Sequence, residues 1–277
     1  MNKEYIEERK TISEIAHKAG RSPAYTQGAG GNVSIKTDDG NMIIKASGCR
    51  LADVSPEYGL ACVNINAVKN SIMGKTVSQT EFDMAISSAK IPLCGKTAKP
   101  SVETGFHSLL HKYVIHHHSV YANVMSCCSE GVVFAAQLFP ESRFIPFCQP
   151  GLELCLAIRE SLDERPLSSR RPEIFFFANH GLAISADNAD EALNTMEDVN
   201  NKIKRHFSMP DFNLDFNTDY ESFPDMLGIF TLDQLLYMPD TKKRPCNNTE
   251  KEIYAAASFI LDQHKNLGLS TVLIDKC

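Results

Sequence analysis

Histidine is concentrated in one short part of this 277-residue sequence, where five of the nine histidines lie between His107 and His118. In the run His116-His117-His118 the outer two side chains would point to the same face of a strand, because side chains alternate along a strand. His117 would then face away. A further histidine, His180, follows the apolar run EIFFFA at an expected tight turn. Imidazoles that converge from such positions can share one cation.

The carboxylate of Glu103, upstream of the histidine cluster, completes a candidate metal site. Three imidazoles and one carboxylate form a borderline-soft nitrogen and oxygen set that suits Zn²⁺, with Mn²⁺, Co²⁺ or Fe²⁺ as possible substitutes. We therefore predict that the metal ligands are His116, His118, His180 and Glu103. Glu103 is also the predicted catalytic residue, since a carboxylate beside the cation can move a proton on the substrate.

A second grouping competes for the same role. Glu103, His107 and His111 are spaced by four and would line one face of a helix. They could bind a metal together, or they could form an ordinary packing or solvated face. The strand pair could likewise be a polar strand end without metal. We favour the strand pair as the primary ligands.

A glycine-rich segment supplies the second half of the predicted site. Gly28, Gly30 and Gly31 allow backbone amides to approach an anion, and nearby amide and hydroxyl side chains could add donors. The segment matches neither a Walker A sequence nor a GxGxxG fingerprint, so an ordinary glycine turn is the alternative. The predicted substrate- or phosphate-binding residues are Gly31, Asn32, Ser47, Gly48 and Ser101.

Strands and helices mostly alternate along the sequence, which predicts an α/β or α+β sandwich. A polar connection is expected over residues 66–80. Helices are expected at 5–19, 101–113, 152–162, 188–207 and 250–264, and strands at 33–36, 42–45, 60–65, 114–116, 143–147, 173–178, 182–185 and 271–274.

Composition narrows the class of protein. With 43% hydrophobic and 22% charged residues the chain is an ordinary globular protein. A net charge of -6 and a pI near 5.9 argue against a nucleic-acid partner. The charged start MNKEYIEERK and the lack of a long apolar run predict a cytoplasmic protein without a membrane span. Its nine cysteines are expected to be reduced thiols.

Five short motifs occur in an order that resembles the class II aldolase/adducin family: GGNVSIK, IIKASG, PSVET, VIHHHS and ANHGL. The resemblance covers roughly residues 5–207. The sequences IIKASG, KPSVET and HKYVIHHHS are most similar to the aldolase part of rhamnulose-phosphate aldolase/alcohol dehydrogenase proteins, and fuculose-phosphate aldolases are also similar.

The resemblance implies a three-layer α/β/α sandwich with a central, mainly antiparallel sheet. It implies a class II aldolase/adducin-like domain over residues 1–210, followed by a C-terminal extension over 211–277 that packs on the domain or at a subunit interface. It also implies zinc on His116, His118 and His180, a substrate contact at Asn32, Ser47 and Gly48, and a homotetramer. Val102 departs from the second hydroxyl residue that sugar-phosphate aldolases often carry there, so phosphorylation of the substrate stays open.

The function implied is that of a metal-dependent aldolase, which cleaves or forms a carbon–carbon bond in a ketose or ketose phosphate through a zinc-stabilised enediolate. A sugar-phosphate 4-epimerase that uses the same site is one alternative. A non-catalytic, adducin-like assembly module is the other.

Overall fold

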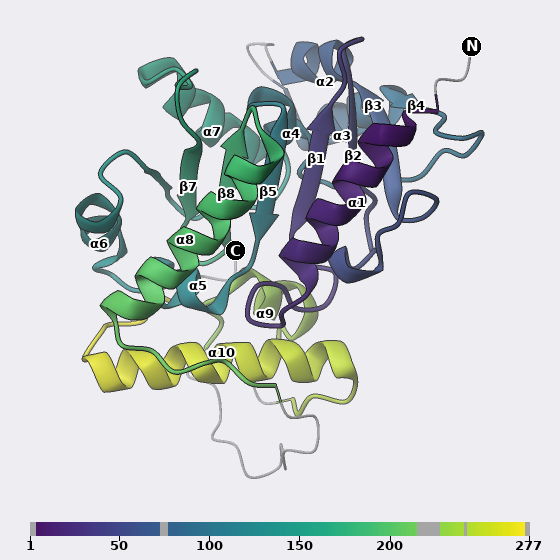
Figure 1. Ribbon diagram of the computed structural model, residues 1–277. Coiled ribbons are helices and arrows are strands. Elements are labelled where there is room, and N and C mark those ends of the chain that lie inside the picture. Colours follow the sequence, from purple (N-terminus) through teal and green to yellow (C-terminus); the bar gives the residue numbers. More distant parts are fainter. Residues whose placement is uncertain (1–3, 73–76, 215–227, 241–242, 275–277) are drawn as a thin grey trace.

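An eight-stranded sheet forms the centre of the protein (Figure 1). The computed structural model describes residues 4–72, 77–214, 228–240 and 243–274. The strand order is β4-β3-β2-β1-β5-β8-β7-β6, and every neighbouring pair is antiparallel except β6 and β7. The strands are β1 (Asn32–Lys36), β2 (Asn41–Lys45), β3 (Leu60–Asn64), β4 (Lys90–Ile91), β5 (Tyr113–His117), β6 (Arg143–Ile145), β7 (Glu173–Phe177) and β8 (Gly181–Ala186).

Helices cover both faces of this sheet, so the expected α/β/α sandwich with a mainly antiparallel sheet is confirmed. Helices α1 and α8 pack on one face, and α2, α4 and α7 lie on the other. The helices are α1 (Ile6–Gly20), α2 (Ile65–Ile72), α3 (Gln79–Ser88), α4 (Thr104–Leu109), α5 (Val120–Ser126), α6 (Gly131–Leu138), α7 (Leu152–Glu164), α8 (Ala189–His206), α9 (Leu232–Tyr237) and α10 (Asn248–Leu267).

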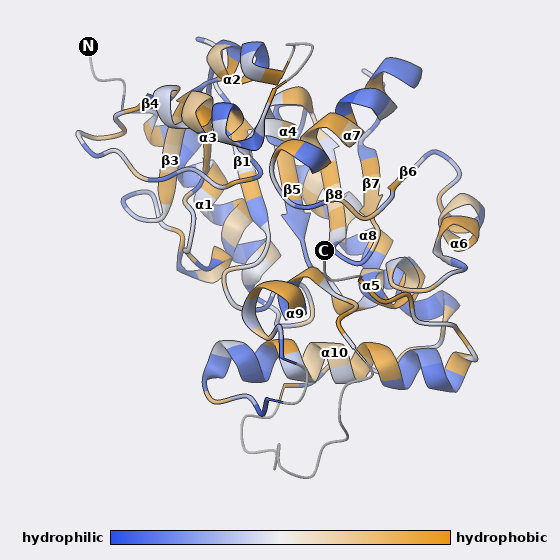
Figure 2. Ribbon diagram, turned by 180° about the vertical axis from the view of Figure 1, so that it is seen from behind, coloured by the Kyte–Doolittle hydropathy of each residue, from blue (hydrophilic) through white to orange (hydrophobic). Residues whose placement is uncertain are grey.

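The strands feed two hydrophobic cores because their side chains alternate between the two faces. In β5, Val114 belongs to the core beneath α2, α4 and α7, whereas Ile115 belongs to the core beneath α1 and α8. In β8, Ala183 and Leu182 divide in the same way. Figure 2 shows the strands of the sheet as mostly apolar. Within the described part of the chain, no helix is both long and apolar enough to cross a bilayer.

Three of the expected elements are corrected by the structure. The polar connection expected at 66–80 begins instead with helix α2, whose buried residues Ile65, Val68 and Ile72 are set among polar ones that hid its apolar face. The helix expected over 101–113 is limited to Thr104–Leu109. The strand expected at 271–274 forms only an isolated bridge between Thr271 and Cys128, outside the sheet.

The C-terminal helices α9 and α10 lie together at one end of the sheet (Figure 1). Asn179, in the turn between β7 and β8, forms hydrogen bonds with segments next to both helices. Its side-chain amide donates to the carbonyl oxygens of Phe230 and Val272, each at 2.8 Å. Its own carbonyl oxygen accepts from the Leu232 amide at 2.8 Å. Asn179 adopts φ +58°, in the left-handed region that asparagine tolerates better than most residues.

Replacing Asn179 with alanine should lower the free energy of unfolding by roughly 2–4 kcal/mol, because two carbonyl groups lose their donor and alanine is strained at positive φ. Chemical denaturation of the metal-free protein measures this loss. Asn179→Gly is the matched variant, since it loses the same hydrogen bonds without that strain, and it should be about 1 kcal/mol more stable than the alanine variant. Wild-type stability in both variants would contradict the role of Asn179.

Candidate metal centre

Strand β5 sends its consecutive histidines to opposite faces. His116 pairs with Ala183 of β8 in the register of the sheet, and it packs edge-on against Phe106, with ring centroids 5.8 Å apart. His117 faces the other core, where its ring lies 5.5 Å from that of Tyr25. His118 follows the last residue of the strand and returns to the face of His116. The predicted alternation of the three histidines is therefore confirmed.

The structure brings His116, His118 and His180 together as a buried group whose ligand atoms could hold a metal ion. His116 Nε2 lies 3.2 Å from His118 Nε2 and 3.2 Å from His180 Nε2. Four ligands arranged tetrahedrally around Zn²⁺ at 2.0–2.1 Å stand about 3.3 Å apart. The spacing of these nitrogens therefore fits one shared cation.

The contacts of Nδ1 in two of these rings show which ring nitrogen is available to bind a metal. His116 Nδ1 lies 3.0 Å from the carbonyl oxygen of Leu182, and His118 Nδ1 lies 2.8 Å from Asp233 Oδ2. Both partners accept hydrogen bonds, so in the neutral rings Nδ1 carries the hydrogen and Nε2 keeps its lone pair. These Nε2 lone pairs are directed toward the centre of the cluster, which is the tautomer a metal ligand needs.

Glu103 brings a carboxylate to the same centre. Its Oε1 lies 3.3 Å from His180 Nε2 and 3.6 Å from His116 Nε2. This oxygen is buried and has no hydrogen-bond partner among the described residues, as expected for an atom that a cation would satisfy. The other oxygen, Oε2, accepts a hydrogen bond of 2.6 Å from Asn32 Nδ2. Three imidazoles and one carboxylate together form a donor set suited to a divalent cation.

Burial and the neighbouring carboxylates shift the pKa values of the three imidazoles. Burial lowers the pKa of His116 well below its ordinary value and also lowers the pKa of His180, although Glu103 opposes both shifts. Burial acts in the same direction on His118, but the neighbouring Asp233 carboxylate outweighs it and leaves the pKa of His118 raised. Neutral imidazole is the form that binds metal, so the shifts at His116 and His180 favour binding, whereas a protonated His118 would release its proton when a metal binds.

The competing ligand set is not assembled. Glu103 precedes helix α4 instead of lying on its face, and His111 lies beyond the end of this helix. His107 Nδ1 is 2.8 Å from Ser34 Oγ, and His111 Nδ1 is 3.0 Å from Ser185 Oγ. The two histidines thus contact different serines, on β1 and on β8, and do not converge with Glu103.

A pocket of about 310 Å³ opens onto the metal-binding cluster. The predicted binding residues all line it, which brings the glycine segment and the Ser47-Gly48 turn to the same site as the histidines. Gly31 adopts φ +73°, and a Cβ atom there would lie 2.7 Å from the His116 carbonyl oxygen. The lining therefore includes Gly31, Asn32, Ser47, Gly48, Ser101, Glu103, His118 and His180.

Asn32 is already engaged within the site. Its side-chain nitrogen donates to Ser101 Oγ at 3.0 Å and to Glu103 Oε2 at 2.6 Å, which uses both amide hydrogens. Asn32 therefore orients the carboxylate of Glu103 and favours its ionised form. Ser47 and Gly48, by contrast, are exposed at the edge of the pocket.

Several residues that line the pocket were not predicted from the sequence. Lys45, only 2% exposed, lines the pocket, and α9 contributes Asp233, Leu236 and Tyr237. Burial lowers the pKa of Lys45 to about 8, so its amine is mainly charged at neutral pH. A lysine inside the apolar run IIKASG was the available signal for Lys45.

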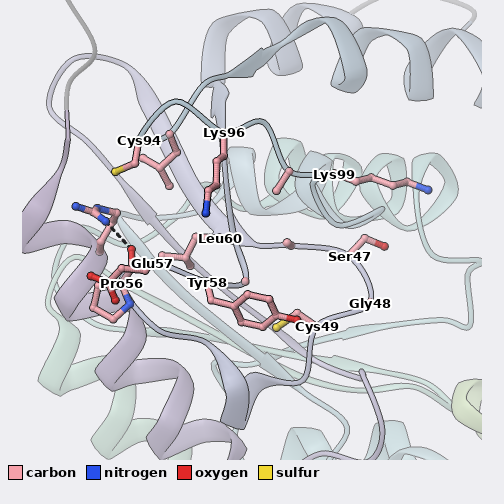
Figure 3. Close-up of a pocket in the computed structure, with 15 residues that line it drawn as sticks. Ser47, Gly48, Cys49, Pro56, Glu57, Tyr58, Leu60, Cys94, Lys96 and Lys99 are labelled. Atoms are coloured by element: carbon pink, nitrogen blue, oxygen red, sulfur yellow. Dashed lines mark hydrogen bonds between the residues drawn. The ribbon is translucent and has the colours of Figure 1, made fainter.

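A second cavity, of about 470 Å³, adjoins the site at the Ser47-Gly48 turn (Figure 3). Figure 3 shows Lys96 and Lys99 on its wall, with amines that point in different directions. The turn is thus shared by both cavities, whereas the histidines belong to the smaller one alone.

The fold and the site define an α/β protein with a buried histidine cluster able to hold a divalent cation. The family model described as "Class II Aldolase and Adducin N-terminal domain" matches residues 10–206. The chain therefore belongs to the class II aldolase and adducin family.

Individual relatives are more distant. The chain is 23% identical to a 3-oxo-tetronate 4-phosphate decarboxylase of Haemophilus influenzae, over 75% of this chain and 92% of that protein. It is 25% identical to the protein of the same name from Escherichia coli K12, over 68% of this chain and 80% of that protein. The N-terminal class II aldolase domain of a conserved protein from Thermoplasma acidophilum has a similar fold, with a TM-score of 0.62, 18% identity, and coverage of 73% of this chain and 92% of that one.

Proposed function

We propose that this protein is a metal-dependent carbon–carbon lyase that acts on a small ketose or 3-oxo acid, with a phosphate as a further anionic group. The observation that carries the proposal is the cluster of His116, His118 and His180 beside Glu103. Glu103, His118 and His180 also line the pocket. A divalent cation held there would act as a Lewis acid on the substrate carbonyl and offset the negative charge that develops when the bond breaks. The three imidazoles and Glu103 would hold it, and Zn²⁺ is the metal we propose.

Glu103 is the proposed proton-transfer residue. Its Oε2 is fixed by Asn32, so Oε1 remains directed at the cluster, where the ionised carboxylate can take a proton from a substrate hydroxyl group or from solvent and then give it to the carbon that loses its bond. Glu103 is largely buried, with 5% of the residue exposed, and it lines the pocket. This arrangement favours an enzyme over an adducin-like assembly module, because an assembly role needs neither the converging imidazoles nor the carboxylate.

Two lyase reactions fit this site. Aldol cleavage of a ketose phosphate is supported by the aldolase-like motifs around Glu103 and His116. Decarboxylation of a phosphorylated 3-oxo acid is supported by the names of the curated relatives. Both break a bond to the carbon next to a ketone and leave an enolate, which is an enediolate where that carbon carries a hydroxyl group. A 4-epimerase would break and rejoin the bond without release of either fragment.

Product analysis separates these reactions. Purified protein with its metal content measured is incubated with a phosphorylated 3-oxo acid and, separately, with ketose phosphates. Release of CO2 identifies a decarboxylase, release of an aldehyde an aldolase, and an inverted hydroxyl group without release an epimerase. A metal-free preparation that stays inactive on every substrate after addition of Zn²⁺, Mn²⁺, Co²⁺ or Fe²⁺ would overturn the proposed function. The homotetramer stays a prediction, which light scattering can test on the same preparation.

Lys45 is the proposed contact for an anionic group of the substrate. Its amine donates to the carbonyl oxygens of Ala29 and Cys49, at 3.1 and 2.6 Å, and a third hydrogen remains. Replacing Lys45 with methionine should lower kcat/KM about 10- to 100-fold, because a hydrogen bond to a charged group contributes about 1.5–3 kcal/mol. Steady-state kinetics with the phosphorylated substrate measures the loss.

The pH profile gives this prediction a second measurement. Because the pKa of Lys45 is lowered to about 8, its charge is present below that pH and lost above it. Wild-type kcat/KM should therefore decline as the pH rises through about 8, and the Lys45→Met profile should lack this decline. Lys99→Met is the matched control, since it removes an exposed lysine from the neighbouring cavity. Equal losses in both variants would count against Lys45.

A further inference from the structure

A carboxylate from the C-terminal part of the chain contacts one histidine of the metal-binding cluster. Asp233 Oδ2 lies 2.8 Å from His118 Nδ1, and both side chains are buried. We infer that Asp233 is a positioning residue of the metal centre, which is thereby completed by a segment outside the family-matched residues 10–206. This inference rests on the proposed metal centre.

The contact selects the nitrogen of His118 that can bind metal. A carboxylate accepts the hydrogen of Nδ1, so the lone pair of the neutral ring is on Nε2. That Nε2 is the atom 3.2 Å from His116 Nε2. A carboxylate behind a ligating imidazole holds the ring in place and raises the basicity of the binding nitrogen. Asp233 can therefore act on the metal through His118 without touching it.

The short helix α9 presents Asp233 in a defined direction. Thr231 caps its first turn, where its hydroxyl accepts from the Gln234 amide and the Gln234 side chain accepts from the Thr231 amide. A carboxylate in the first turn of a helix interacts favourably with the positive end of the helix dipole. This interaction does not determine the direction of the side chain. Here Oδ2 is turned to His118, while the buried Oδ1 has no hydrogen-bond partner among the described residues. His118 is thus the partner that compensates the burial of this carboxylate.

The same helix is tied to a second metal-binding residue. The Leu232 amide at its start donates to the carbonyl oxygen of Asn179, the residue directly before His180. The Asn179 side chain in turn holds the carbonyl oxygen of Phe230. Helix α9 therefore contacts His118 through a side chain and the turn of His180 through the backbone.

Helix α10 secures the glycine segment that lies beside His118. Glu252 of α10 is 6% exposed and accepts from the Gly28 amide at 2.8 Å and from Arg50 at 2.8 Å. Gly30 lies so close to His118 that a Cβ atom would stand 2.8 Å from its Nδ1. The C-terminal part of the chain thus contacts His118 directly through Asp233 and indirectly through the glycine segment.

Coupling must be reciprocal if Asp233 supports the metal through His118. A contact that strengthens metal binding is itself strengthened when metal binds, because the two equilibria share one free energy of coupling. Metal should therefore slow hydrogen exchange of the backbone amides in α9. Because metal also stabilises the fold as a whole, the coupling is measured by the difference in this protection between wild type and an Asp233 variant.

Zinc affinity, measured by competition with a chromogenic chelator, tests the inference. Asp233→Ala should weaken zinc binding about 10- to 100-fold, the usual effect of losing a carboxylate behind a histidine ligand. Asp233→Asn keeps an acceptor without the charge and should fall between the alanine variant and wild type. Glu173→Gln is the matched control, because Glu173 is an equally buried carboxylate paired with Arg143 at the other end of the sheet.

The outcomes distinguish this inference from the proposed function. Support requires that Asp233→Ala binds zinc more weakly, that Glu173→Gln binds it like wild type, and that zinc protects α9 amides in wild type but not in the alanine variant. Should Asp233→Ala fail to fold, the affinity and exchange of Asp233→Asn decide in its place. Equal affinity in wild type and the Asp233 variants, or equal weakening in Glu173→Gln, would overturn the role of Asp233 alone. A wild-type protein that binds no divalent metal would overturn the metal centre itself.

Discussion

Removing the metal should abolish turnover and destabilise the fold at the same time. Zinc as a Lewis acid contributes several kcal/mol to the barrier, so the chelator-treated protein should lose roughly 10³-fold or more in kcat. A cation present at 100 times its Kd adds about 2.7 kcal/mol to the free energy of unfolding. For a chain of this size that energy corresponds to a fall in Tm of roughly 5–10 °C.

A variant makes the same test without a chelator. His180→Ala removes one of three imidazoles from a turn, where the loss disturbs the sheet less than a change at His116 within β5 would. Elemental analysis should find less than one metal ion per chain, and kcat should fall with it. His17→Ala, which removes an exposed histidine of α1, should keep full metal content and activity. Full activity of the chelated protein or of His180→Ala would contradict the proposed centre.

The converging histidines were predictable because local rules determine them. Side-chain alternation sends His116 and His118 to one face of β5 whatever surrounds the strand. His180 follows a buried strand, and the asparagine before it suits the left-handed turn that returns the chain along β8. Their meeting also requires β5 and β8 to be neighbours, as the structure shows. From the sequence, the family resemblance implied only that the three histidines share one zinc.

Asp233 was not predictable from local pattern. It lies 115 residues beyond its partner His118 in the sequence, in a helix of only six residues. So short a helix shows no periodicity, and nothing in its residue types marks a contact with a distant strand. Lys45 was missed for a different reason, since a lysine in an apolar strand is ambiguous until the burial of its amine is known.

The end of α4 shows how a distant side chain overrides a local pattern. The sequence from Ser101 to Tyr113 has helical spacing throughout, yet the helix ends at Leu109. The amine of Lys36, on the neighbouring strand β1, donates to the carbonyl oxygen of His111 at 2.7 Å and satisfies it outside a helix. The chain can then enter β5 at Tyr113. This termination removes His111 from the face it would otherwise have shared with His107.

Replacing Glu103 with glutamine should reduce kcat by about 10²- to 10⁴-fold, the contribution usual for a positioned acid or base. Glutamine keeps the size of the side chain and can still meet Asn32, but it cannot exchange a proton with the substrate carbon. Zinc should remain bound at near full occupancy, because His116, His118 and His180 still converge. Steady-state kinetics and elemental analysis on the same preparation measure the two properties.

Isotope exchange tests the role of Glu103 in proton transfer separately from its role as a metal ligand. In D2O a wild-type lyase that protonates its product through Glu103 should incorporate deuterium at the carbon that lost its bond, and Glu103→Gln should slow this incorporation as much as it slows turnover. Ser101→Ala is the companion variant, since Ser101 shares the Asn32 amide but carries no carboxylate. It should retain most of the exchange rate. If Glu103→Gln kept wild-type exchange, or lost turnover only because its metal was lost, Glu103 would be a ligand and another residue would transfer the proton.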